Sequence, residues 1–134
     1  MAEHAVVTDT HPLLYYAAGS SRLGREAAAI FAAAGVGDAI VYVPTAVVME
    51  IVFLTRAGKS GLRVRPADFF HTLFLNPAFQ PMELTPDQVI AAGMLRFNTD
   101  PFDALVVVAA RQLELPLVTR DAAIVESQLV EVLW

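Results

Sequence analysis

Short apolar runs rich in β-branched residues alternate along this chain with longer segments whose apolar residues recur at helical spacing. The short runs predict strands at residues 5–8, 39–43, 79–84, 115–119 and 129–134. The longer segments predict helices at residues 12–16, 22–34, 45–57, 66–76 and 85–96, and from residue 100 onward. This alternation indicates an α/β fold with a mostly parallel sheet and right-handed crossovers, in which the last strand lies at an edge.

Two helix boundaries carry clear sequence signals. Thr45 is predicted to cap the helix over residues 45–57, and Gly58 is its stop signal. Thr85 is followed three residues later by Gln88, which is the spacing of a capping box.

Glu50 is the one acid in the helix predicted over residues 45–57, which is apolar on nearly all sides. A lone carboxylate is costly to remove from water, so glutamate is rarely buried without a partner. We therefore expect Glu50 either to face a polar pocket or to meet a cation.

Composition indicates one globular domain that spans residues 1–134. The chain is 56 % hydrophobic and only 17 % charged, which argues against disorder. No apolar run reaches the roughly 18 residues needed to cross a bilayer, and Met1 to His4 do not resemble a signal peptide. The absence of cysteine excludes a disulfide framework and is consistent with a cytoplasmic protein.

The charges are distributed unevenly. The net charge of −5 does not indicate a strongly basic nucleic-acid-binding protein. Nevertheless, residues 56–65 contain four basic side chains and no acid, whereas acids outnumber arginines after residue 83. This basic stretch is either a solvated loop or a basic margin beside an acidic site. Its members are Arg56, Lys59, Arg63 and Arg65.

Four aspartates occupy positions where an α/β sheet gathers its functional groups. Asp9 and Asp121 each follow a predicted strand, so they belong at the edge where ligands bind in such sheets. Asp100 is predicted as the N-cap of a helix that begins with Pro101, which places Asp103 in its first turn. Each acid alone has a structural explanation as a turn or capping residue. If this helix enters from the same edge, all four face one crevice.

Carboxylates that share a crevice repel one another unless a positive charge lies among them. A site of oxygen ligands without cysteine or histidine favours Mg²⁺ or Mn²⁺. Such an ion activates water and neutralises charge on a leaving oxygen, which suits phosphodiester hydrolysis. Together with Glu50, the acids therefore predict a metal site.

Other phosphate chemistries match the sequence less well. Gly58-Lys59-Ser60 resembles the end of a P-loop, but Phe53 occupies the position of its first glycine. Asp9 lacks the second aspartate, two positions on, of an aspartyl-phosphate hydrolase. A metal-dependent phosphatase and a DNA nuclease remain alternatives.

Taken in order, several motifs resemble the PIN domain, and most closely the VapC-type toxins of bacterial toxin–antitoxin pairs. The likeness covers nearly the whole chain. It is carried by Asp9-Thr10-His11 with residues 13–16, the Glu50 helix ending at Gly58-Lys59, Asp100-Pro101-Phe102-Asp103, residues 117–121 and Val132-Leu133-Trp134.

The resemblance implies a three-layer α/β/α domain that is a Mg²⁺- or Mn²⁺-dependent endoribonuclease. It implies a cognate antitoxin that blocks the site, and a homodimer. It also implies an RNA substrate, and the basic stretch defined above would contact this RNA. Asp100 would be auxiliary, and the hydroxyls of Thr10 and Thr119 would contact metal-bound water. The implied catalytic and metal-binding acids are Asp9, Glu50, Asp103 and Asp121.

The chain departs from similar toxins around Asp103. Those often read His-Arg-Asp-Pro-Phe-Asp-Arg, whereas this chain has Asn98 and Thr99 before the motif and Ala104 after it. A basic residue that would steady the acids or touch RNA is therefore absent. The departure motivates a second hypothesis, namely a catalytically silent PIN-like module that acts through a partner protein.

Overall fold

The computed structural model describes residues 4–134, so the expectation about an N-terminal leader concerns mainly residues outside this range. Within it, the strands are β1 (His4–Thr8), β2 (Ala39–Pro44), β3 (Phe79–Met82), β4 (Leu117–Val118) and β5 (Val132–Leu133). The helices are α1 (Thr10–Ala18), α2 (Arg25–Gly35), α3 (Thr45–Arg56), α4 (Pro66–Leu73), α5 (Pro86–Gly93), α6 (Pro101–Leu113) and α7 (Ala122–Ser127). None of these helices is long and apolar enough to span a bilayer.

All five described strands form one sheet in the order β3-β2-β1-β4-β5, and every neighbouring pair is parallel. Val7 of the central strand pairs with Tyr42 on one side and with Leu117 on the other. The predicted parallel sheet is confirmed, and so is the edge position of the last strand. The other edge strand, β3, tolerates Pro81 because proline lacks the N–H that a central strand must donate.

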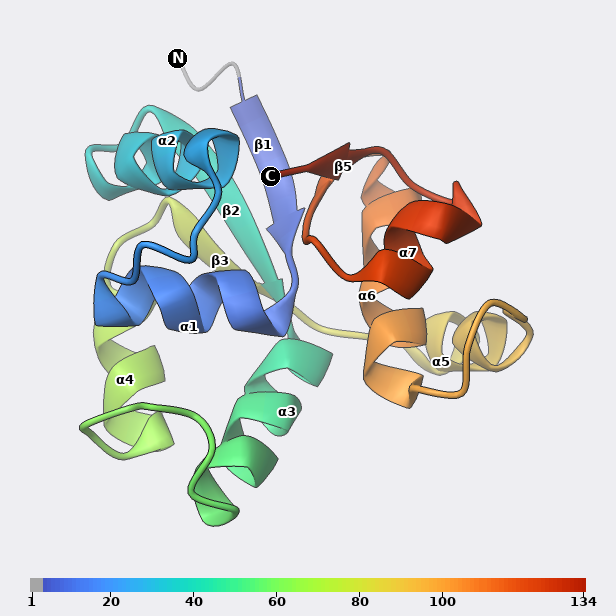
Figure 1. Cartoon of the computed structure of the whole chain (residues 1–134), viewed down its shortest axis with the longest axis horizontal. Helices are drawn as coiled ribbons and strands as arrows, with labels where there is room; N and C mark the ends of the chain where they lie inside the picture. The colour runs from blue at the N-terminus through green and yellow to red at the C-terminus, as the bar shows by residue number, and fades with distance from the viewer. Residues whose placement is uncertain (1–3) are drawn as a thin grey trace.

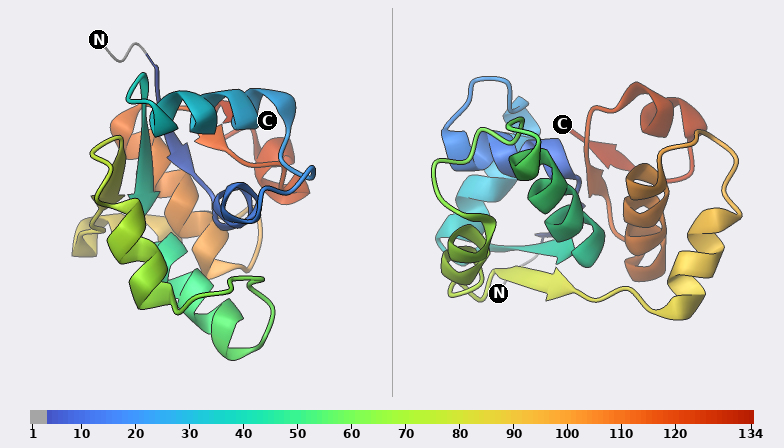
Figure 2. Two further views of the ribbon diagram at one scale, coloured as in Figure 1. Left: turned by 90° about the vertical axis from the view of Figure 1, so that its left-hand side faces the viewer. Right: turned by 90° about the horizontal axis from the view of Figure 1, so that it is seen from below.

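Helices cover both faces of the sheet. The chain moves from β1 to β2 to β3 in one direction and then crosses to β4 and β5 in the other, so right-handed crossovers place the two sets of helices on opposite faces. Figure 1 shows α1, α2 and α4 on the left and α5, α6 and α7 on the right, and the view from below in Figure 2 shows the same separation. Helix α2 packs against β2, and α6 packs against β1 and β4. The expected three layers are confirmed.

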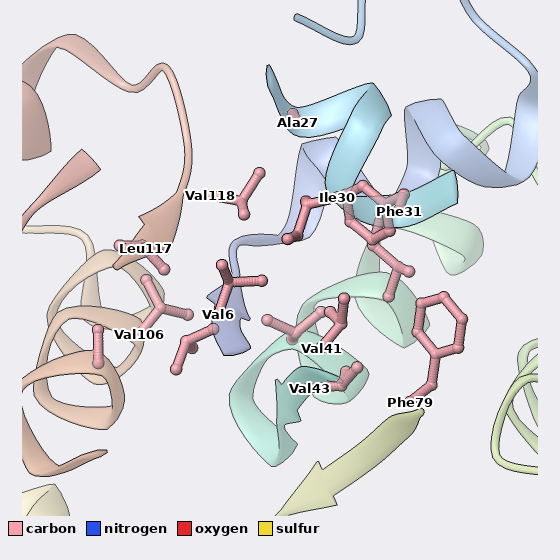
Figure 3. Close-up of a cluster of buried hydrophobic side chains, with 14 of the residues drawn as sticks. Val6, Ala27, Ile30, Phe31, Val41, Val43, Phe79, Val106, Leu117 and Val118 are labelled. Atoms are coloured by element: carbon pink, nitrogen blue, oxygen red, sulfur yellow. The ribbon is translucent and has the colours of Figure 1, made fainter. Parts of the chain in front are cut away.

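The hydrophobic core lies on both faces of these strands. On one face, Phe31 of α2 stacks against Phe79, with ring centroids 6.3 Å apart, and Val41 of β2 lies beside them (Figure 3). On the other face, Val106 of α6 approaches Leu117 of β4 (Figure 3). Central parallel strands are covered twice, which explains their almost continuous apolar sequence.

Some predicted boundaries are wrong. Thr45 does not cap α3; it is the first helical residue, and Pro44 occupies the capping position without a side-chain hydrogen bond. Helix α2 begins at Arg25 rather than residue 22, because the N-cap is Gly24. In contrast, the capping box of Thr85 and Gln88 is present.

The last two strands are shorter than predicted, and each pairs over only two residues. The apolar pattern extends beyond the paired residues because neighbouring side chains still pack against the core. Helix α7 has no counterpart among the predicted elements, although the interpretation of Asp121 as a helix cap points to it.

Candidate active site

The site lies between β1 and β4, where the order in which the chain adds strands to the sheet reverses. Strands β1 and β4 are adjacent and parallel, but the helices that follow them, α1 and α7, lie on opposite faces (Figure 1). The loops at their carboxyl ends therefore diverge and open a crevice, which is where open α/β sheets bind ligands. Asp9 follows β1 directly, and Thr119, Arg120 and Asp121 follow β4.

A pocket of about 310 Å³ occupies this crevice. It contains all five acids that the sequence singled out, drawn from four separate segments of the chain. Its lining residues are Asp9, His11, Pro12, Tyr15, Glu50, Asp100, Asp103, Thr119, Arg120, Asp121 and Trp134.

Asp9 is buried at the junction of β1 and α1. Its Oδ1 accepts a hydrogen bond from the backbone N–H of Thr10 at 2.8 Å, and its Oδ2 accepts one from the Thr119 hydroxyl at 2.8 Å. Burial raises the pKa of Asp9, and these hydrogen bonds partly oppose that effect because they favour the charged form. The nearby charge of Asp121 raises the pKa further.

Glu50 faces this pocket from α3, so the first of the two alternatives for this residue holds. Its Oε1 accepts a hydrogen bond from the Thr10 hydroxyl. Partial burial raises the pKa of Glu50, and the charges of Asp9 and Asp100 act in the same direction.

Asp100 and Asp103 occupy the start of α6. Asp100 is the N-cap, as predicted, and its Oδ1 accepts from the backbone N–H of Phe102 at 2.9 Å. Asp103 is 9 % exposed, and its Oδ2 accepts from the side-chain amide of Asn98 at 2.7 Å. Burial, together with the charges of Asp100, Asp121 and Asp9, raises the pKa of Asp103 to about 7. Near neutral pH this carboxylate is therefore poised between its two protonation states.

Asp121 caps α7 through a 3.0 Å hydrogen bond from the backbone N–H of Ile124 to its Oδ1. The Thr119 hydroxyl oxygen accepts from the backbone N–H of Asp121 at 3.1 Å while its O–H donates to Asp9. The hydroxyls of Thr119 and Thr10, for which the resemblance implies contacts to metal-bound water, donate to carboxylates in this structure. They fix the orientation of Asp9 and Glu50.

None of these acids forms an ion pair within residues 4–134, where Arg65–Asp68 is the single salt bridge, although His11 lowers the pKa of Asp9 and Glu50 slightly. The donor set, made of carboxylates alone, fits Mg²⁺ or Mn²⁺. However, no three carboxylate or histidine side chains in the described range are close enough, as they are placed, to hold one ion together. The fit of these residues to a divalent cation therefore rests on the chemistry of the donors and on the pocket that they share. Within residues 4–134 they do not form a preformed coordination shell.

The four predicted RNA-contact residues all lie in the described part of the chain, and none of them lines this pocket. They are Arg56, Lys59, Arg63 and Arg65. Arg65 instead pairs with Asp68, with Nε and Oδ2 3.0 Å apart. Lys59 is nearer, because it lines a second pocket that shares His11 and Tyr15 with the first.

The sequence did not single out the basic residue that does line the pocket, Arg120. Its guanidinium carbon lies 5.6 Å from the ring centroid of Tyr15 and 5.4 Å from that of Trp134. The only available signal was its position between Thr119 and Asp121, two predicted site residues. Tyr15 and Trp134 lie in motifs that carry the family resemblance, but the sequence did not assign them to the site, because aromatic residues in apolar segments usually belong to the core.

A family model of the PIN domain matches residues 6–126. The chain belongs to the PIN domain family. Among curated proteins, no sequence matches it significantly.

Solved structures with this fold include toxin–antitoxin proteins. VapC20 of Mycobacterium tuberculosis, described as a sarcin-ricin loop cleaving toxin, is 20 % identical to this chain. Its TM-score is 0.68 over 96 % of this chain and 99 % of that one. VapBC2 of Rickettsia felis, bound to a DNA fragment from its promoter, is 12 % identical, with a TM-score of 0.64 over 96 % of each chain. FitAcB of Neisseria gonorrhoeae is 16 % identical, with a TM-score of 0.61 over 95 % of each chain. At these identities the likeness establishes the fold.

Proposed function

We propose that this protein is a Mg²⁺- or Mn²⁺-dependent endoribonuclease and the toxin of a cytoplasmic toxin–antitoxin pair. One observation carries the proposal: Asp9, Glu50, Asp103 and Asp121 converge on one pocket, and none of them forms an ion pair among residues 4–134. Carboxylates gathered without a counter-charge raise one another's pKa, and a divalent cation relieves that repulsion. The family and its VapC neighbours support the same function.

The residues of the pocket have different proposed roles according to their positions. Asp9, Glu50, Asp103 and Asp121 hold the metal, and Asp100 is auxiliary because its Oδ1 already caps α6. Thr10 and Thr119 orient the acids opposite them through hydroxyl hydrogen bonds. Bound Mg²⁺ or Mn²⁺ supplies Lewis acidity, which makes water a better nucleophile and stabilises charge on the phosphodiester. Lys59, at the neighbouring pocket, is placed best among the basic stretch to meet the RNA.

The proposed partners are an antitoxin and a second copy of this chain. The solved neighbours include toxin–antitoxin complexes, which supports an antitoxin partner. We propose that this antitoxin covers the acidic pocket. Exposed apolar side chains support the homodimer. On α3 they are Met49, Val52 and Phe53, and on α5 they are Val89 and Ile90. Surface helices that expose several large apolar residues often mark protein interfaces.

The experiment is a cleavage assay with purified protein and total bacterial RNA, in Mn²⁺, in Mg²⁺ and in EDTA. We expect cleavage only with metal, and cleavage slower by roughly 10²–10³-fold in Asp9→Asn and Asp103→Asn, in line with the loss of a major electrostatic group. Asp38→Asn, an exposed acid outside the pocket, is the matched control and should retain full activity. Circular dichroism checks that each variant folds. Full activity of either pocket variant would falsify the assignment.

A second candidate is a catalytically silent PIN-like module. It is favoured by the spacing of the acids, since no three in the described range are close enough to share an ion as placed. It predicts antitoxin binding with no metal-dependent cleavage of RNA. Parallel assays with single-stranded DNA and a phosphate monoester separate the ribonuclease from a DNA nuclease or a phosphatase.

A further inference from the structure

Arg120 lies against two aromatic rings at the edge of the acidic pocket. Its guanidinium lies over Tyr15 and over Trp134, and its Nη2 donates a 3.4 Å hydrogen bond to the Tyr15 hydroxyl. The two rings themselves meet edge to face, with centroids 6.4 Å apart and an interplanar angle of 73°. Three side chains that are far apart in the sequence therefore form one unit, which we call the arginine clamp.

Trp134 is fixed in this position by α2. Its backbone carbonyl accepts from the N–H of Glu26 at 3.1 Å. Its ring fills the space beside Gly24, where an added Cβ would lie 2.5 Å from the Trp134 Cδ1 atom. The Trp134 side of the clamp is thus anchored before any ligand arrives.

The orientation of Arg120 is unusual for a cation beside so many acids. It follows Thr119 and precedes Asp121, yet it forms no ion pair with a carboxylate in the described range. The side chain is exposed, so its remaining N–H groups are free to meet a ligand. A planar guanidinium that stacks on aromatic rings is pre-organised, so it loses less entropy when it binds a phosphate.

The charge of Arg120 is opposite to that of the acids in the pocket, so it can attract a phosphate that they repel. Five carboxylates line the pocket and repel any phosphate that approaches. Arg120 is the one arginine or lysine in that lining. The pocket has a volume of about 310 Å³, at the small end of ligand pockets, so an extended strand must pass largely across its mouth.

We propose that the arginine clamp, Arg120 held by Tyr15 and Trp134, is a phosphate-binding subsite for a single-stranded RNA backbone beside the acidic pocket. The subsite rests on the proposed function for its substrate class. It grips a phosphodiester neighbouring the one that is cleaved, so its loss weakens substrate binding more than the chemical step. Charge-assisted, forked hydrogen bonds to phosphate oxygens are the interaction that this side chain is shaped to make.

The first test measures binding without chemistry. Trp134 is the single tryptophan of the chain, so its fluorescence reports on the clamp. A random-sequence 20-nucleotide RNA pool is titrated in EDTA at several salt concentrations. For the wild-type protein we expect a change in Trp134 fluorescence on binding. For Arg120→Ala we expect that change to be lost and the slope of log K against log salt to fall by roughly 0.7, the value of one single-strand phosphate contact.

Matched variants give this test its controls. Arg96→Ala removes an exposed arginine that does not line the pocket, and should leave both readouts unchanged. Arg120→Lys keeps the charge but loses the planar fork, and should fall between wild type and alanine. Gly24→Ala leaves Arg120 in place but displaces Trp134, and should weaken binding in the same direction. Equal slopes for Arg120→Ala and Arg96→Ala, or no Trp134 response in the wild type, would overturn the subsite.

The second test separates this proposal from the proposed nuclease. In the Mn²⁺ cleavage assay we expect Arg120→Ala to raise KM about tenfold or more, as for a lost charge-assisted hydrogen bond, with kcat changed much less. An unchanged KM would overturn the subsite while the nuclease stands. If the wild type does not cleave RNA but still binds it through Arg120, the subsite stands and the nuclease fails.

Discussion

Helices α3 and α6 have similar sequences in outline and different surroundings. Both are apolar over most of their length, and each carries one acid to the pocket, Glu50 on α3 and Asp103 on α6. Helix α6 lies on the face of the sheet over β1 and β4, and α3 and α5 pack against it. Its buried positions are Asp103, Val106, Val107, Val108, Ala109 and Ala110.

Helix α3 buries only Ala46, Val47 and Ile51. It follows the end of β2, where there is less sheet to cover, and it leaves Met49 and Phe53 51 % and 45 % exposed. An apolar helix sequence therefore does not by itself show which of its side chains are buried in the domain. In α6 the apolar residues are buried within the domain, whereas in α3 part of them is exposed on its surface.

The largest expected effect lies in the buried half of this comparison. Val107→Asp on α6 places an unpaired charge at a position that is 0 % exposed, which costs on the order of the whole stability of a domain, about 5 kcal/mol or more. We expect it to abolish folding. Val52→Asp, the same change at a 36 % exposed position of α3, should cost about 1 kcal/mol or less. Urea unfolding followed by circular dichroism measures both. Comparable losses would mean that α3 is as deeply packed as α6.

The exposed half of the comparison predicts self-association. Replacing both Met49 and Phe53 by glutamate should convert a dimer to a monomer and weaken association by more than tenfold, because charge would enter an apolar interface. Analytical ultracentrifugation measures the change. Val36→Glu, at another exposed apolar residue just after α2, is the control and should leave the oligomer intact. A double variant that remains dimeric would remove this face from the interface.

The two acids predict a smaller, pH-dependent effect. The pKa of Asp103 is raised to about 7, so the folded protein binds a proton more tightly than the unfolded chain does, and metal-free stability falls as the pH rises from about 4 to 7. Asp103→Asn removes that loss. We expect it to stabilise the metal-free protein by about 1–2 kcal/mol at pH 8, after a discount for solvent screening, and by less at pH 5.

Urea unfolding in EDTA at pH 5 and pH 8 measures this difference. Glu50→Gln should act in the same direction but more weakly, because Glu50 is only half-buried. Adding Mg²⁺ at pH 8 should stabilise the wild type and not Asp103→Asn. A wild type that is more stable than Asp103→Asn in EDTA at pH 8 would contradict the raised pKa.

The smallest effect concerns the amide that holds Asp103. Asn98 donates to its Oδ2 and favours the ionised form, so Asn98→Ala should raise the pKa of Asp103 further. Mn²⁺ binding at pH 7 should weaken about fivefold, which corresponds to about 1 kcal/mol for one hydrogen bond. Calorimetric titration measures the affinity, with Thr99→Ala as the neighbouring control. An affinity that does not change would show that Asn98 plays no part in the site.

The sequence predicted what local rules determine. Asp100 caps α6 and Thr85 begins a capping box because both interactions lie within one helical turn. Asp9 and Asp121 were placed correctly at the carboxyl edge, since a parallel sheet brings strand ends together regardless of the intervening chain.

What the sequence did not predict depends on contacts between distant residues. Arg120 and Tyr15 are 105 positions apart, and neither carries a local signal of their stacking. The exposed side of α3 was missed for the same reason, because periodicity shows that a residue is apolar but not whether a neighbour covers it. Thr45 failed as a cap because Pro44 ends β2 and already occupies the capping position.

The two-residue strand β5 has a consequence for motion. It is held to the sheet by β4 alone, and it is continuous with Trp134, one wall of the pocket. Short edge strands open locally at a lower free energy than the core does. An opening that also breaks the hydrogen bond from the Glu26 N–H to Trp134 removes that wall, so occupancy of the pocket and closure of the edge strand are thermodynamically linked. Amide hydrogen exchange at Leu133 should therefore slow when the crevice is filled, although the residue lies outside it.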